Sequence, residues 1–296
     1  MPLPADPIIV APSPTPFRDD DSIDFAAIER NVGRWLATPL SGFVLNSENG
    51  EEAFLSERER LEIVRTVHRA REGRGFLIGG VDNPCVTETL RTAEALVEAG
   101  AEMLRIRIPR LTANVRGYFE QVIPRAAAPV AIIHQMAPGL FLSAPAPSGA
   151  PAELLGEIVA MDNVFGYIAS ADLRFEARVR TFVPAEKRFW TANGSLLLSG
   201  AAVGANGACM MLGNVAPREC LEVLQLATAG KFAAAQALQT RLIEPDWRIL
   251  SHGAAGLKAA LNLLGYEAGV PRSPTPPCTA AQLGQIRSAL EHADLL

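Results

Sequence analysis

Short apolar runs alternate with longer segments whose apolar residues recur at helical spacing along the whole chain. The runs show no polar alternation, which is typical of parallel strands covered on both faces. Eight strands are predicted: Pro7–Ala11, Gly42–Leu45, Phe76–Gly79, Met103–Ile108, Val130–His134, Val164–Ile168, Arg188–Thr191 and Gly207–Met211. Arg105 and Arg107 interrupt the fourth run, which is unusual for a covered strand.

The segments between these strands predict helices. Ser56 and Glu59 have the spacing of a capping box, so a helix is expected to start at Ser56 and run to about Arg71. The segment Thr87–Ala99 ends at Gly100, a frequent helix C-cap residue. Further helices are predicted at Ile23–Leu36, Val115–Ala127, Ala152–Met161, Leu173–Val183, Ser195–Val203 and Pro217–Ala229.

Eight strand–helix units fit the arithmetic of a (β/α)8 TIM barrel, an α/β fold, over residues 1–229. A doubly wound open sheet is the competing fold, but no GxGxxG follows the first strand. Residues 230–296 contain no convincing strand and are expected to form a C-terminal helical extension packed on the barrel. Its helices are predicted at Phe232–Leu250, His252–Leu264 and Thr279–Leu290.

Composition and charge exclude several classes of binding partner. The 296 residues carry 27 basic and 32 acidic side chains, a net charge of −5, without a basic cluster, which argues against nucleic acid or an anionic membrane as the partner. No run of 18 apolar residues predicts a transmembrane helix. The N-terminus lacks the basic residues of a secretory signal, and the four cysteines show no CxxC pair, so a reducing cytoplasm is the expected location.

Polar side chains follow several predicted strands at their carboxyl ends, where TIM barrels carry their active residues. We predict His134 and Glu48 as catalytic residues. His134 would act as a general acid or base near neutral pH, with Glu48 orienting it. The predicted substrate-binding residues are Ser47, Asn49, Arg107, Arg110 and Asn193.

In this scheme the bound molecule is a small anionic substrate. Arg107 or Arg110 would hold the anion, and Asn193 would donate a hydrogen bond to a developing oxyanion. Structural roles remain open: Glu48 could cap a helix, and His134 could be a hydrogen-bonded structural group. Arg107 could instead form a surface ion pair with Glu102 or Glu120.

A metal site built from Glu48, His134 and another carboxylate is conceivable. No paired-histidine motif supports it, so we expect neither a metal nor a cofactor.

Several motifs resemble the dihydrodipicolinate synthase / N-acetylneuraminate lyase family. Their order and spacing along the chain are similar to those of the family over nearly its whole length. They are Thr15-Pro16-Phe17, Ser47-Glu48-Asn49-Gly50-Glu51, Gly213-Asn214-Val215-Ala216-Pro217, Leu257-Lys258-Ala259-Ala260-Leu261 and Val270-Pro271-Arg272-Ser273-Pro274.

The resemblance implies a barrel with C-terminal helices, assembled as a homotetramer or dimer. It also implies a lysine on the sixth strand that forms a Schiff base with pyruvate or another 2-oxo acid, so that a neighbouring carbon–carbon bond can form or break. A tyrosine after the fifth strand would carry the proton, and the loop after the second strand would bind the carboxylate.

The sequence departs from this pattern at the reacting positions. The residue aligned with the Schiff-base lysine is Ile168, and the tyrosine aligns best with His134. Two threonines of the family's loop are replaced by Glu48 and Asn49. The three lysines of the chain, at positions 187, 231 and 258, lie elsewhere in the predicted fold.

The sequence leaves two functions open. The first is a lyase or hydratase that acts on a small 2-oxo or sugar-acid type substrate by acid–base chemistry without a Schiff base. The alternative is a catalytically silent homologue that keeps the barrel as a ligand-binding or assembly protein.

Overall fold

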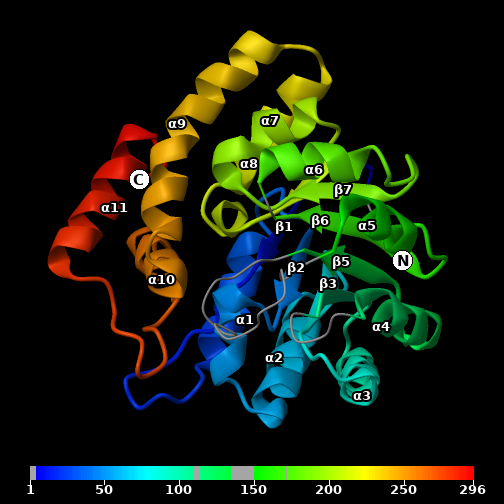
Figure 1. Ribbon diagram of the computed structural model, residues 1–296. Coiled ribbons are helices and arrows are strands. Elements are labelled where there is room, and N and C mark those ends of the chain that lie inside the picture. Colours follow the sequence, from blue (N-terminus) through cyan, green and yellow to red (C-terminus); the bar gives the residue numbers. More distant parts are fainter. Residues whose placement is uncertain (1–4, 110–113, 135–149, 171) are drawn as a thin grey trace.

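Eight parallel strands close into a barrel, with helices around it (Figure 1). The computed structural model describes residues 5–109, 114–134, 150–170 and 172–296. The last strand pairs with the first, and every strand pairs with its neighbours in sequence. The strands are β1 Ile8–Pro12, β2 Gly42–Leu45, β3 Phe76–Val81, β4 Met103–Arg107, β5 Val130–Ile133, β6 Val164–Ala169, β7 Arg188–Thr191 and β8 Gly207–Cys209.

The predicted TIM barrel with C-terminal helices is confirmed. Each of the eight predicted strands is found, with small changes at its ends. The described helices of the barrel are α1 Phe25–Trp35, α2 Glu57–Ala70, α3 Val86–Glu98, α4 Val115–Val122, α5 Ala152–Val159, α6 Leu173–Arg180, α7 Leu197–Ala202 and α8 Pro217–Thr228. The helices that follow are α9 Phe232–Leu250, α10 Gly253–Leu263 and α11 Ala280–His292.

Side-chain caps account for several helix starts. Ser56 and Glu59 form the predicted capping box at the start of α2, each satisfying a backbone N–H of the other. Asp24 and Asp172 cap α1 and α6 by accepting from the third residue after them. These caps fix where the chain turns from each loop into its helix.

Alternation along the strands separates two apolar layers. Residues such as Leu104 and Ile132 point outward into the layer between strands and helices. Their neighbours point inward and fill the barrel with a second cluster: Ile8, Val10, Val44, Phe76, Ile78, Met103, Ala131, Ile133, Ile168, Trp190 and Cys209. Because side chains alternate, Arg105 and Arg107 share the inward face of β4 with Met103.

The long helix α9 stands at the side of the barrel and is tied to the loop after β7 (Figure 1). The buried carboxylate of Asp246 accepts hydrogen bonds from the backbone N–H and the hydroxyl of Ser195, at 2.8 and 2.6 Å. Gln239 donates to the carbonyl of Gly194 at 2.9 Å. These bonds bring the last turn of α9 to the carboxyl end of the barrel. In the described part of the chain, no helix has the length and apolarity needed to cross a membrane.

Candidate active site

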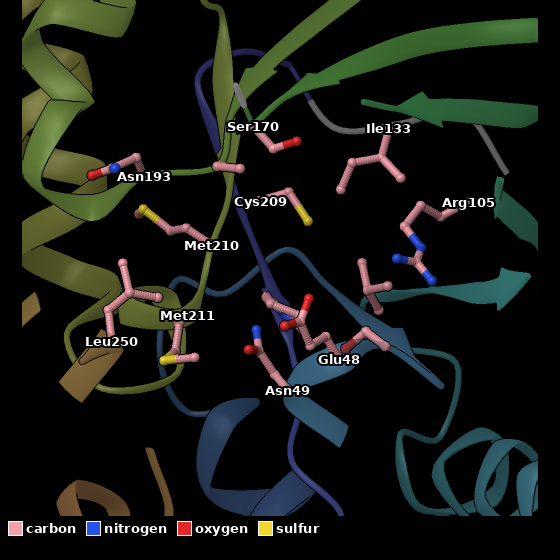
Figure 2. Close-up of a pocket in the computed structure, with 14 residues that line it drawn as sticks. Glu48, Asn49, Arg105, Ile133, Ser170, Asn193, Cys209, Met210, Met211 and Leu250 are labelled. Atoms are coloured by element: carbon pink, nitrogen blue, oxygen red, sulfur yellow. The ribbon is translucent and has the colours of Figure 1, made fainter. Parts of the chain in front are cut away.

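A cavity of about 460 Å³ lies at the carboxyl ends of the strands. Figure 2 shows Arg105 and Ile133 entering it from one side, and Asn193 and Met210 from the other. Its walls come from β1, β2, β4, β5, β8, the segments after several strands, and the end of α9. The described lining residues are Pro12, Val44, Ser47, Glu48, Asn49, Arg105, Ile133, Ser170, Ala192, Asn193, Cys209, Met210, Met211 and Leu250.

Four of the predicted site residues line this cavity. Ser47, Glu48 and Asn49 come from the loop after β2, where residues 48–50 form a single 3₁₀ turn. Asn193 follows β7, and its side-chain oxygen accepts from the backbone N–H of Ser195 at 3.0 Å. This bond uses the amide oxygen of Asn193 and leaves its NH₂ group as the donor. Among the described lining residues, Glu48 supplies the only carboxylate.

His134 does not line the cavity. It follows β5 with the opposite orientation to Ile133, and its ring stacks on Phe175 of α6 at a centroid distance of 5.1 Å. Its Nε2 accepts from the backbone N–H of Ala150 at 3.4 Å. Burial lowers the pKa of His134 to about 4, so the ring is neutral at pH 7. The prediction that His134 and Glu48 pair at the cavity is therefore corrected. The histidine lies between the barrel wall and α6.

Arg107 is also placed differently from the prediction. Its side chain is fully buried and donates to Glu52 at 2.8 Å and to Asp82. It does not pair with Glu102, whose carboxylate binds Arg71 at 3.2 Å. Arg107 is therefore a member of a buried ion network and not a described lining residue. Arg110 lies outside the described residues.

Arg105 is the cavity cation that the sequence prediction missed. It lies two residues before Arg107, on the same inward face of β4, and lines the cavity. Its Nη2 donates to Glu52 at 3.2 Å and to the carbonyl of Asn46 at 3.4 Å. The break in the apolar run was the available signal. Either arginine could cause that break, and the sequence does not show which of the two lines the cavity.

The position aligned with the family lysine faces the barrel interior. Ile168 is fully buried in the inner apolar cluster and is the register partner of Ile133. Ile133 faces inward beside Ile168, whereas His134, which aligns with the family tyrosine, faces outward. Hydrocarbon side chains thus meet inside the barrel at Ile133 and Ile168.

The three lysines have other environments. Lys187 donates to the carbonyls of Met161 and Val164, at 3.1 and 2.6 Å, where β6 begins. This is the end of the barrel opposite the cavity. Lys231 is exposed at the start of α9, and Lys258 is buried in α10. None of them is among the described lining residues.

Cys209 lines the cavity on β8, but burial raises the pKa of its thiol to about 12. A neutral thiol is a poor nucleophile at pH 7. The described residues contain no group of three His, Cys, Asp or Glu side chains arranged to hold a metal ion.

Comparison with known proteins identifies the ancestry of this barrel. The model of the dihydrodipicolinate synthetase family matches residues 6–293. The chain belongs to this family.

Individual relatives agree with the family assignment. The 4-hydroxy-tetrahydrodipicolinate synthase of Archaeoglobus fulgidus is 26% identical over 287 residues, covering 95% of this chain and 96% of the relative. That of Ruegeria pomeroyi is 28% identical over 287 residues, covering 95% and 97%. Among solved structures, YagE from E. coli K12 in complex with pyruvate superposes with a TM-score of 0.86 at 19% identity, covering 98% and 99% of the two chains, which shows the shared fold.

Four of the five motifs that carry the family resemblance meet outside the cavity, in a cluster that we call the clamp: Phe17, Glu51, Lys258, Val270 and Arg272. Lys258 donates to Glu51 and, at 2.7 Å, to the carbonyl of Val270. Its ammonium lies 4.4 Å from the centre of the Phe17 ring. The backbone N–H groups of Val270 and Arg272 donate to the Phe17 carbonyl and the Glu51 carboxylate, at 3.1 and 2.9 Å.

The clamp joins the C-terminal connector to the loop that carries Glu48. Burial lowers the pKa of Lys258 to about 8, while Glu51 opposes this shift. The Lys258 ammonium therefore remains mostly charged at pH 7 and holds Glu51 in place. Family motifs thus account for the position of the loop, whereas its cavity-facing residues, Glu48 and Asn49, differ from the family's threonines.

Proposed function

We propose that the protein is a lyase or hydratase that acts on a small 2-oxo or sugar-acid type substrate by acid–base chemistry without a lysine Schiff base. The observation that carries this proposal is the lining of the cavity: polar groups at the rim, and hydrocarbon inside the barrel at Ile168, the position aligned with the reacting lysine, and at its strand partner Ile133. An isoleucine has no amine, so it cannot withdraw electrons through an iminium ion.

Glu48 is the proposed acid–base group. As a carboxylate it would remove a proton from the carbon next to the substrate's carbonyl or carboxylate, and it would return that proton to the departing group. The negative charge that develops on the substrate oxygen needs a donor. The NH₂ group of Asn193 is suited to this role because its amide oxygen is already held by Ser195.

The substrate class is inferred from size and kinship. A cavity of about 460 Å³ suits a small molecule. The YagE structure contains pyruvate, a 2-oxo acid, and that protein shares the fold. In this proposal His134 supports the end of β5 as a neutral, stacked ring and takes no part in proton transfer.

A catalytically silent homologue is the second candidate. The fully buried inner cluster around Ile168 favours it, because a barrel that keeps its cavity but replaces the reacting side chains by hydrocarbons can bind without turnover.

The Glu48→Gln variant separates the two candidates. Wild type and variant are incubated with a panel of 2-oxo, 2-hydroxy and sugar acids, and conversion is followed by NMR in D₂O. We expect turnover by wild type and a loss of about 10²- to 10⁴-fold in kcat for Glu48→Gln, with KM little changed. Glu57→Gln is the matched control, because Glu57 lies on the surface in an ion pair with Arg91.

If wild type binds acids but converts none of the panel, the silent homologue is supported. If Glu48→Gln keeps the wild-type kcat, Glu48 is not the acid–base group.

We also propose that the chain forms a homotetramer or dimer. The exposed apolar side chains of Ile243 and Trp247, one turn apart on α9, support an association surface there. Light scattering of the purified protein measures the subunit number, and a monomer would overturn this proposal.

A further inference from the structure

Arg105 occupies a place that the surrounding backbone makes for it. Its neighbour in register on β3 is Gly80. A Cβ atom at position 80 would lie 2.6 Å from Nη2 of Arg105 and 2.1 Å from the carbonyl oxygen of Asn46. The absence of a side chain at Gly80 therefore allows the guanidinium to lie against the strand wall, with 2% of the residue exposed.

The hydrogen bonds of Arg105 are incomplete. Both of its bonds leave from Nη2, to Glu52 and to the carbonyl of Asn46. Nε is buried without a partner, and Nη1 has none among the described residues. A guanidinium has five N–H donors, so most of those of Arg105 remain unused.

The neighbouring Arg107 differs from Arg105 in its ion pairs and in its position relative to the cavity. It binds Glu52 and Asp82, and it does not line the cavity. Glu52 is thus shared between two guanidinium groups, and within the described residues Arg105 binds no second carboxylate. Since a buried charge is costly unless it is paired and hydrogen-bonded, an anion in the cavity would be favoured at Arg105.

The surroundings of the guanidinium define the rest of the ligand. Val44, Ile133 and Cys209 line the same cavity, and the Cys209 thiol is neutral. Glu48 lies below Arg105 on the lining of the same cavity in Figure 2. A carboxylate at the arginine would therefore be followed by a short, weakly polar carbon chain that leads toward Glu48.

We propose that Arg105 binds the substrate carboxylate, so that the ligands are small 2-oxo or 2-hydroxy acids held by a side chain of β4. This inference rests on the proposed function for the orientation of the substrate, with its reacting carbon toward Glu48. Binding of the carboxylate to Arg105 can be tested without turnover. Arg105 is a binding residue in this assignment, and Glu48 remains the acid–base group.

Isothermal titration calorimetry with pyruvate, 2-oxobutyrate, L-lactate and D-gluconate tests the assignment. We expect wild type to bind at least one of these acids. Arg105→Met should weaken that binding by about 10- to 150-fold, the range of a charged hydrogen bond. Arg105→Lys should give an intermediate loss, because it keeps the charge but not the planar fork. Selectivity for pyruvate over the neutral pyruvamide should disappear in Arg105→Met.

Arg71→Met is the matched control, since Arg71 is similarly buried and binds Glu102 at the other end of the barrel. It should change acid binding by less than about 3-fold. If Arg105→Met does not fold, Arg105→Lys carries the test.

Three outcomes separate the two proposals. Unchanged acid binding in a folded Arg105 variant overturns the role of Arg105, as does a wild type that binds none of the four acids. Arg105-dependent binding without conversion of any acid supports the anchor and overturns the lyase or hydratase proposal.

Discussion

The clamp and the cavity lie on two sides of the same loop, yet they preserve different amounts of the family pattern. At the clamp, Glu51 and Lys258 stand where the family motifs have a glutamate and a lysine, and they form a buried ion pair. At the cavity, Glu48 and Ile168 are the residues that we align with a threonine and the reacting lysine of the family pattern, and both differ from it. The clamp residues of the quoted motifs thus hold the loop in place, whereas the cavity residues depart from the pattern.

This difference separates evidence for ancestry from evidence for chemistry. The clamp connects residues more than 200 positions apart, such as Glu51 and Lys258, and so ties α10 to the loop after β2. The clamp residues lie within residues 6–293, which the family model matches. The reaction depends on a few side chains in the cavity, which can change while the clamp remains.

Breaking the clamp is expected to have the largest effect on stability. Lys258→Met would leave the buried carboxylate of Glu51 without its ammonium partner, at a cost of about 3–5 kcal/mol in the free energy of unfolding. Urea denaturation followed by circular dichroism measures this loss. The exposed Lys231→Met is the control and should change the free energy by less than about 0.5 kcal/mol.

A Lys258→Met, Glu51→Gln double variant sharpens the same comparison. Removing the second charge should restore part of the stability, because no unpaired ion then remains buried. A Lys258→Met loss below about 1 kcal/mol would show that the clamp does not hold the loop.

His134, on the outer side of β5, is expected to have a smaller effect on stability, which depends on pH. Its pKa of about 4 in the folded chain lies below the ordinary 6.5, so the unfolded chain binds more protons between these pH values. The free energy of unfolding should therefore fall as the pH drops from 6.5 to 4, by up to about 3 kcal/mol from this residue.

His134→Gln removes this titration and tests its sign. The stability difference between wild type and variant, measured by urea denaturation at pH 7, 5.5 and 4, should move in favour of the variant at acid pH. Parallel stability curves would mean that His134 is not held neutral by burial, and a titrating histidine beside the cavity would then return as an acid–base candidate.

Periodicity was sufficient to predict the elements of the fold, because covered strands and amphipathic helices leave repeating apolar patterns. The residues of the candidate site were harder to predict. His134 was expected at the cavity because the predicted fifth strand ended with it. Side chains alternate along a strand, so a shift of one residue moves a side chain from the cavity to the outer layer. Ile133 takes the inward place.

The role of Arg105 depends on partners that are distant in sequence. Glu52 and Asn46 come from the β2–α2 segment, and Gly80 from β3 makes room for the guanidinium. No local pattern links these residues. The sequence did indicate the loop residues Ser47, Glu48 and Asn49, because they directly follow a strand at the end where barrels carry their chemistry.

Mass spectrometry after borohydride treatment tests the absence of a reactive amine in the cavity. The intact protein is incubated with pyruvate, reduced with borohydride and weighed, with an Ile168→Lys variant treated in parallel. We predict an unchanged mass for wild type, since no described lining residue carries a primary amine. A trapped pyruvate adduct on wild type would contradict the account and return the protein to Schiff-base chemistry.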